Sequence, residues 1–122
     1  MPSYTAPLDD MLFLFEKLRD NKNYNDLEKY NEVNLDLVKD ILEEAAKINQ
    51  NLLLPLALSG DENPAKLENG VVRTPPGYKE AYQKYIEDGW ISLSCEPKYG
   101  GQGMPKTVSA FFDEMLSSTS LS

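Results

Sequence analysis

The sequence predicts a mainly α-helical fold with one small β-hairpin near residues 66–73. Apolar residues recur at three- and four-residue spacing in four separate segments, which is the period of an amphipathic helix. An Asn69-Gly70 pair lies between two short runs that contain apolar residues, and this pair is typical of a two-residue hairpin turn. At 122 residues and 41% hydrophobic content, the chain has the size and composition of about one globular domain.

The first predicted helix covers residues 8–18. One stripe at helical spacing contains Leu8, Met11, Leu12, Phe15 and Leu18. Phe13 and Leu14 lie outside the stripe, so this helix is apolar on more than one face and is expected to be sandwiched or to dock on another surface. The polar segment 21–34 is predicted to be a connector with one short turn around residues 26–30.

A second helix is predicted to begin after Asn34, whose side chain can cap it. Its apolar face contains Val38, Ile41, Leu42, Ala45, Ile48, Leu52 and Leu56. Pro55 lacks a backbone donor, so we expect the helix to kink or end near Leu54. Residues 60–64 have the composition of a loop.

Two further helices are predicted after the hairpin. One covers residues 78–88, stops at Gly89 and is followed by Trp90, which we expect to be buried. The other begins near Pro105. Its inward face contains Val108, Phe111, Phe112, Met115 and Leu116.

The composition excludes several classes of function. Acidic residues outnumber basic ones by 20 to 12, and the net charge of −8 argues against nucleic acid as a partner. The sequence has no apolar run long enough to span a membrane and no signal-peptide pattern at its start, so the expected location is the cytoplasm. The sequence has no histidine, and Cys95 is its single cysteine. It therefore contains no residues for an intrachain disulfide, a Ser-His-Asp triad or an ordinary zinc site. We therefore assign no catalytic, cofactor-binding or metal-ligating residue.

Three features of the sequence are candidate sites. The Gly100-Gly101-Gln102-Gly103 segment precedes a helix, as phosphate-binding loops do, but it fits neither GxGxxG nor the P-loop pattern and is predicted to be a tight structural turn. Cys95 has no histidine to activate it and is expected to be a small buried residue. Glu114 lies at the margin of the last apolar stripe, where a solvent-facing glutamate is the simpler interpretation.

A series of short motifs resembles the N-terminal region of the flavin-dependent acyl-CoA dehydrogenases. The resemblance is strongest to the bacterial subgroup with an N-terminal extension, the methylthiopropanoyl-CoA dehydrogenase-like enzymes. The motifs, in order, are Tyr4-Thr5-Ala6-Pro7-Leu8, Ile41-Leu42-Glu43-Glu44-Ala45-Ala46, Leu54-Pro55-Leu56, Gly60-Asp61, Leu67-Glu68-Asn69-Gly70-Val71-Val72, Pro75-Pro76-Gly77-Tyr78, Gly89-Trp90, Tyr99-Gly100-Gly101-Gln102-Gly103 and Glu114-Met115-Leu116-Ser117-Ser118. Each motif alone is weak, whereas nine in this order are specific.

The resemblance implies two parts. Residues 1–33 are an N-terminal extension with one helix, and residues 34–122 are the family's N-terminal helical domain in incomplete form. The family removes the α and β hydrogens of an acyl-CoA thioester, with a glutamate taking the α-proton and hydride passing to FAD. Electron-transfer flavoprotein then accepts the electrons, and the complete enzyme is expected to be a homo-oligomer.

The same resemblance implies that the flavin and C-terminal domains are absent, so the chain alone is expected to bind no FAD and to be inactive. In the family, the helix after the glycine turn lines the acyl-chain end of the substrate pocket. By motif position Phe111, Glu114, Met115 and Ser118 are the acyl-pocket candidates, and Phe111 is placed by helical spacing alone.

Two other functions remain open from the sequence. The first alternative is a stand-alone helical interaction module that binds a partner protein or an acyl chain. The apolar faces of the chain are larger than its short helices can cover, and this favours such a module. An acidic protein that masks a basic partner is the weaker third possibility, because it rests on net charge alone.

Overall fold

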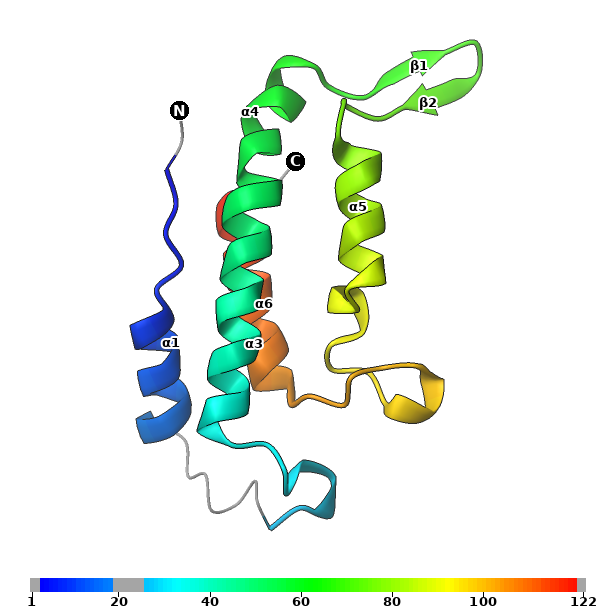
Figure 1. Ribbon diagram of the computed structural model, residues 1–122. Coiled ribbons are helices and arrows are strands. Elements are labelled where there is room, and N and C mark those ends of the chain that lie inside the picture. Colours follow the sequence, from blue (N-terminus) through cyan, green and yellow to red (C-terminus); the bar gives the residue numbers. More distant parts are fainter. Residues whose placement is uncertain (1–2, 19–25, 121–122) are drawn as a thin grey trace.

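The computed structural model describes residues 3–18 and 26–120 and is mainly helical, with a two-stranded antiparallel hairpin, as predicted. Its centre is one long helical segment, to which the other helices are added (Figure 1). The longer elements are α1 (Leu8–Phe13), α3 (Leu35–Ile48), α4 (Leu54–Glu62), β1 (Lys66–Glu68), β2 (Val71–Arg73), α5 (Tyr78–Glu87) and α6 (Lys106–Thr119). Single 3₁₀ turns occur at Glu28–Tyr30, Trp90–Ser92 and Pro97–Tyr99.

The core lies where α1 and α6 pack against α3. Leu42 and Val38 of α3, Met11 of α1, and Phe112 and Met115 of α6 are almost completely buried there. The predicted inward stripe of α6 is confirmed, except that Leu116 is only half-buried and lies at the edge of the core.

The predicted first helix is confirmed, and it continues beyond α1 as a π turn, Leu14–Leu18. Met11 and Phe15 are buried, whereas Phe13 and Leu14 remain 56% and 40% exposed. This helix therefore keeps the second apolar face that the sequence indicated. The Leu18 side chain and the first part of the predicted connector lie outside the described residues, and the turn expected near residues 26–30 is the 3₁₀ turn at Glu28–Tyr30.

The start of α3 follows the sequence closely. The Leu37 amide donates to Asn34 Oδ1 at 2.9 Å, so the predicted N-cap is confirmed. Asp36 lies in the first turn, where a negative charge suits the helix dipole.

The end of this helix differs from the prediction. The chain does not leave the helical path near Leu54 but passes through a π turn, Asn49–Leu53, directly into α4. Pro55 falls in the first turn of α4, where its missing amide hydrogen breaks no helical hydrogen bond. Residues 60–62, expected to be loop, form the last turn of α4, and a Cβ on Gly60 would overlap the Tyr78 side chain, so glycine allows this close packing.

The predicted hairpin is confirmed. Asn69 and Gly70 have positive φ angles of 51° and 78°, as a type I′ turn requires. Leu67 pairs with Val72 in the antiparallel register, and both strands are exposed along their whole length. The hairpin projects from the body of the molecule and connects α4 to α5 (Figure 1).

The predicted helix over residues 78–88 is confirmed as α5, with Gly89 as its stop. Gly89 has φ 80° and donates its amide to the Ile86 carbonyl at 2.9 Å. Trp90 is half-buried, whereas the sequence led us to expect a buried side chain. Its ring stacks on the ring of Phe112. The two ring centroids are 4.9 Å apart and the planes differ by 4°, so this stack joins the end of α5 to α6.

The glycine segment before α6 is the structural turn that the sequence indicated. The amides of Gly101, Gln102 and Gly103 donate to the chain's own carbonyls at 3.1, 3.0 and 2.9 Å. These amides are therefore not directed toward a phosphate. The carbonyl that accepts from Gly103 belongs to Cys95, whose side chain is exposed, contrary to the expectation of a buried residue. This turn uses the backbone carbonyl of Cys95 as a hydrogen-bond acceptor, and the Cys95 thiol lies in solvent.

A buried polar pair joins α6 to the π turn after α3. Asn49 and Thr119 are 0% and 2% exposed, and Thr119 Oγ1 lies 3.2 Å from Asn49 Oδ1. Asn49 Nδ2 donates to the Ala45 carbonyl at 2.8 Å. Thr119 Oγ1 also lies 3.0 and 3.1 Å from the carbonyl oxygens of Met115 and Leu116 in its own helix, so its single hydrogen is shared between these acceptors and the Asn49 carboxamide oxygen. The contact with Asn49 is the polar link between the two helices, and it favours one register.

We predict that Thr119→Val lowers the free energy of unfolding by about 1–3 kcal/mol, because it removes a donor from the buried Asn49 oxygen. Urea unfolding followed by circular dichroism measures the change. Ser109→Ala is the matched control, since the Ser109 hydroxyl bonds the Lys106 carbonyl at the surface. Equal midpoints for the two variants would contradict a stabilising role for the pair.

We also predict that Gly101→Ala destabilises the protein by about 3 kcal/mol, because the added Cβ would overlap the Cys95 carbonyl group. Gly100→Ala serves as the comparison: it has φ 85° but meets no atom within 4 Å, so its cost is about 1 kcal/mol. Thermal unfolding of both variants distinguishes the overlap from the general cost of a left-handed backbone. A larger loss for Gly100→Ala would show that the overlap is relieved cheaply.

Candidate functional site

The last helix, α6, presents different residues on three sides. Phe111 and Met115 belong to the core, Glu114 and Ser118 are exposed, and Leu116 borders an apolar groove. The structure therefore places the four predicted acyl-pocket candidates on two separate sides of one helix. Phe111 and Met115 contribute to the packing of α6, and only Glu114 and Ser118 are accessible to a ligand.

Glu114 and Ser118 lie one helical turn apart. The Ser118 hydroxyl donates to the backbone carbonyl of Glu114 at 2.8 Å, and the Glu114 side chain is exposed. Both residues lie close to Tyr4, in the extended segment before α1. The amide of Ala6 in that segment donates to Gln50 Oε1 at 2.9 Å, and this contact holds the segment against the π turn.

Tyr4 is a possible site residue that the sequence did not single out. Its hydroxyl oxygen is buried and, among the residues that the structure describes, has no hydrogen bond of good geometry, although Ser118 approaches it. Burial raises the pKa of Tyr4 most, the nearby Glu114 charge raises it further, and the Ser118 hydroxyl opposes these effects. The phenol is therefore protonated at neutral pH.

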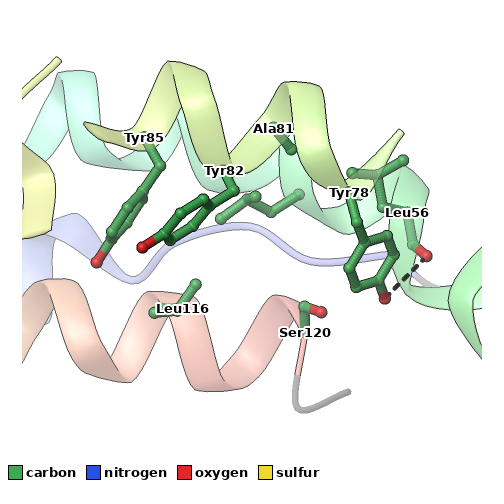
Figure 2. A pocket seen from close by; sticks show the side chains of 8 residues that line it. Leu56, Tyr78, Ala81, Tyr82, Tyr85, Leu116 and Ser120 are labelled. Atoms are coloured by element: carbon green, nitrogen blue, oxygen red, sulfur yellow. Dashed lines mark hydrogen bonds between the residues drawn. The ribbon is translucent and has the colours of Figure 1, made fainter. Parts of the chain in front are cut away.

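An apolar groove with a volume of about 340 Å³ lies between α4, α5 and α6. Figure 2 shows Tyr82 and Tyr85 extending from α5 toward α6, while Leu116 projects from α6 toward them. The full lining is Leu53, Leu56, Tyr78, Ala81, Tyr82, Tyr85, Leu116 and Ser120. We refer to these residues as the α5 groove.

The α5 groove is uncharged along its lining. Its polar atoms come from three tyrosine hydroxyls, from Ser120 and from the backbone, and the Tyr78 hydroxyl donates to the Leu56 carbonyl at 3.4 Å (Figure 2). Tyr85 also tilts against Phe112 of the core, with ring centroids 5.6 Å apart. Burial raises the pKa of Tyr85, and the charge of Asp113 adds to this effect. The groove can thus bind an apolar surface while the Tyr85 hydroxyl stays protonated.

None of the four predicted candidates lines the α5 groove. The sequence predicted the helix over residues 78–88, but not that Ala81, Tyr82 and Tyr85 would line a groove. It could not show that α5 stands apart from α4 and α6 and leaves this face open (Figure 1).

A second depression of about 530 Å³, with charged residues at its rim, lies beside Trp90. Its rim carries the ion pairs Lys47–Glu44 and Lys84–Asp88, so the two cations are already neutralised by their own helices. Trp90 Nε1 is buried and has no hydrogen-bond partner within the described ranges. The ion pairs Lys47–Glu44 and Lys84–Asp88 are exposed, and exposed ion pairs contribute little stability or binding energy.

Residues 3–18 and 26–120 contain no group of three or more histidine, cysteine or carboxylate side chains arranged to hold a metal ion. None of their helices combines the length and apolarity that crossing a membrane requires.

Comparison with known proteins identifies the family. No family model matches the chain. The 3-methylmercaptopropionyl-CoA dehydrogenase of Ruegeria pomeroyi is 38% identical over 120 residues, which are 98% of this chain and 20% of that protein. The broad-specificity linear acyl-CoA dehydrogenase of Mycobacterium tuberculosis is 28% identical over 111 residues, or 88% of this chain and 18% of that protein.

The chain therefore spans about a fifth of the length of the curated relatives that it matches. Both relatives are acyl-CoA dehydrogenases, and the first aligns with nearly every residue, which confirms the resemblance predicted from the ordered motifs. The chain is thus homologous to the acyl-CoA dehydrogenases and corresponds to their N-terminal region.

Proposed function

We propose that this protein serves as the N-terminal domain of an acyl-CoA dehydrogenase, which removes the α and β hydrogens of an acyl-CoA thioester. The observation that carries the proposal is 38% identity to the Ruegeria pomeroyi enzyme across 98% of the chain. In the complete enzyme FAD would accept the hydride from the β-carbon. The chain alone is proposed to be inactive.

The described residues do not fit a flavin. The amides of the glycine turn donate to the chain's own carbonyls, and the α5 groove has no positive charge for a pyrophosphate. No residue of this chain is therefore proposed to act on FAD. Flavin binding and proton abstraction are assigned to parts of the enzyme that this chain does not span.

The proposed contribution of this domain is the acyl-chain end of the substrate pocket. Glu114 and Ser118 would meet the acyl chain on the accessible side of α6, while Phe111 and Met115 would fix that helix from the core side. The position of the matched motif supports this assignment, and so does the exposure of Glu114 and Ser118. Electron-transfer flavoprotein as electron acceptor, a homo-oligomeric enzyme and a cytoplasmic location are further proposals that rest on the homology alone.

A second candidate function is a stand-alone helical module that binds a partner protein or an acyl chain. The open α5 groove and the exposed Phe13 and Leu14 favour this alternative. A module of this kind would be monomeric and would unfold cooperatively. An enzyme domain separated from the rest of its core would instead self-associate or bind a hydrophobic dye.

We predict that a chimera, in which this chain replaces the matching fifth of the Ruegeria pomeroyi enzyme, retains FAD and oxidises 3-methylmercaptopropionyl-CoA with an artificial electron acceptor. Glu114→Leu in the chimera should raise kcat/KM for a longer acyl-CoA relative to this substrate by about tenfold, because an apolar wall favours added methylenes. Glu80→Leu on exposed α5 is the control. A chimera that holds FAD but does not oxidise any acyl-CoA would contradict the proposed function, and equal ratios for the two variants would contradict the pocket assignment.

A further inference from the structure

We infer that the α5 groove is the docking site for an amphipathic helix from the part of the enzyme that this chain does not span. The inference rests on the proposed function, because it assigns the occupant to the same enzyme. It concerns the groove side of α6, which carries Leu116 and Ser120, and not the Glu114 and Ser118 side.

The accessible surface of the chain is larger than its mass predicts. It measures 8138 Å², whereas a compact monomer of 13.8 kDa has about 6,600 Å² by the usual scaling. The excess of about 1,500 Å² exceeds the roughly 800 Å² that each partner contributes to a standard protein interface. Part of this excess belongs to the projecting hairpin, whose two strands are exposed along their whole length, so the location of the docking surface must come from the shape of the fold.

The α5 groove is the part of this surface that suits a helix. Tyr78, Tyr82 and Tyr85 are spaced i, i+4 and i+7, so they follow one side of α5 for about 10 Å, or two helical turns. Leu53 and Leu56 form one wall and Leu116 forms the other. A trough with apolar walls and regularly spaced anchors is the surface that amphipathic helices recognise.

Charge and position distinguish among possible occupants. A second copy would bring another formal charge of −8 to this chain, and the two copies would repel. By contrast, α6 ends beside the groove, with Ser120 in the lining. In an enzyme as long as the relatives, polypeptide that follows α6 starts at the edge of the groove, and consecutive elements usually pack as neighbours.

The first test is hydroxyl-radical footprinting of the 122-residue chain, read by mass spectrometry. Tyr82 is 58% exposed in the groove, and Tyr99 is 80% exposed in a distant turn, so both should be oxidised readily. This measurement requires nothing but the chain itself. An unreactive Tyr82 would show that the groove is closed without a partner and would overturn the inference.

The second test repeats the footprint on the chimera with the Ruegeria pomeroyi enzyme, with FAD retention as the folding control. Docking predicts roughly a fivefold or larger fall in Tyr82 oxidation, since its exposure would drop from 58% to about a tenth, while Tyr99 stays reactive. A chimera that retains FAD and leaves Tyr82 reactive would overturn the inference even if it oxidises acyl-CoA. Protection of Tyr82 without dehydrogenase activity would instead contradict only the proposed function.

A paired substitution gives an independent readout. Tyr82→Glu should leave the thermal midpoint of the free chain close to that of Tyr99→Glu, because both side chains are exposed there. In the chimera, Tyr82→Glu should lower the midpoint by several degrees and Tyr99→Glu should not, because a buried unpaired carboxylate is costly. Equal effects of the two variants in the chimera would contradict docking in the groove.

Discussion

The hydrogen bond between Thr119 and Asn49 is the constraint on which the arrangement of the longest helices depends. It joins the last turn of α6 to the residue at which α3 passes into its π turn, and both side chains are almost completely buried. Apolar contacts between α3 and α6 tolerate small sliding movements, whereas a buried donor and acceptor accept only one register. Leu116 reaches the groove and Glu114 stays in solvent because this register fixes the rotation of α6.

The π turn has a second consequence for the molecule. A helix that ended at Leu54 would leave the hairpin and α5 without a fixed starting point. Because the helical path continues through Pro55 to Glu62, α4 extends beyond the end of the core and carries the hairpin with it (Figure 1). The chain then returns along α5, and the close approach of Tyr78 to Gly60 sets where that return begins. The α5 groove is the space that this geometry leaves between α5 and the other two helices.

The homology and the structure give α6 a role on more than one side. Its core side holds Phe111 and Met115, and its groove side faces the tyrosines of α5. The extended segment with Tyr4 lies near its third side, at Glu114 and Ser118. A helix with one buried side, one side on an open groove and one exposed side suits part of a larger enzyme, and this agrees with relatives about five times as long as the chain.

The sequence by itself determined the features that depend on neighbouring residues. The Asn34 cap, the Asn69-Gly70 turn, the Gly89 stop and the stripe on α6 were all predictable, because each follows from local backbone preference or helical period. Only the tertiary structure decided how the chain passes Pro55, because the π turn depends on packing around Asn49. It also decided that Phe111 and Glu114 face different surroundings and that Tyr82 borders an open groove. These outcomes depend on the distance between helices that are far apart in the sequence, and no local pattern carries that distance.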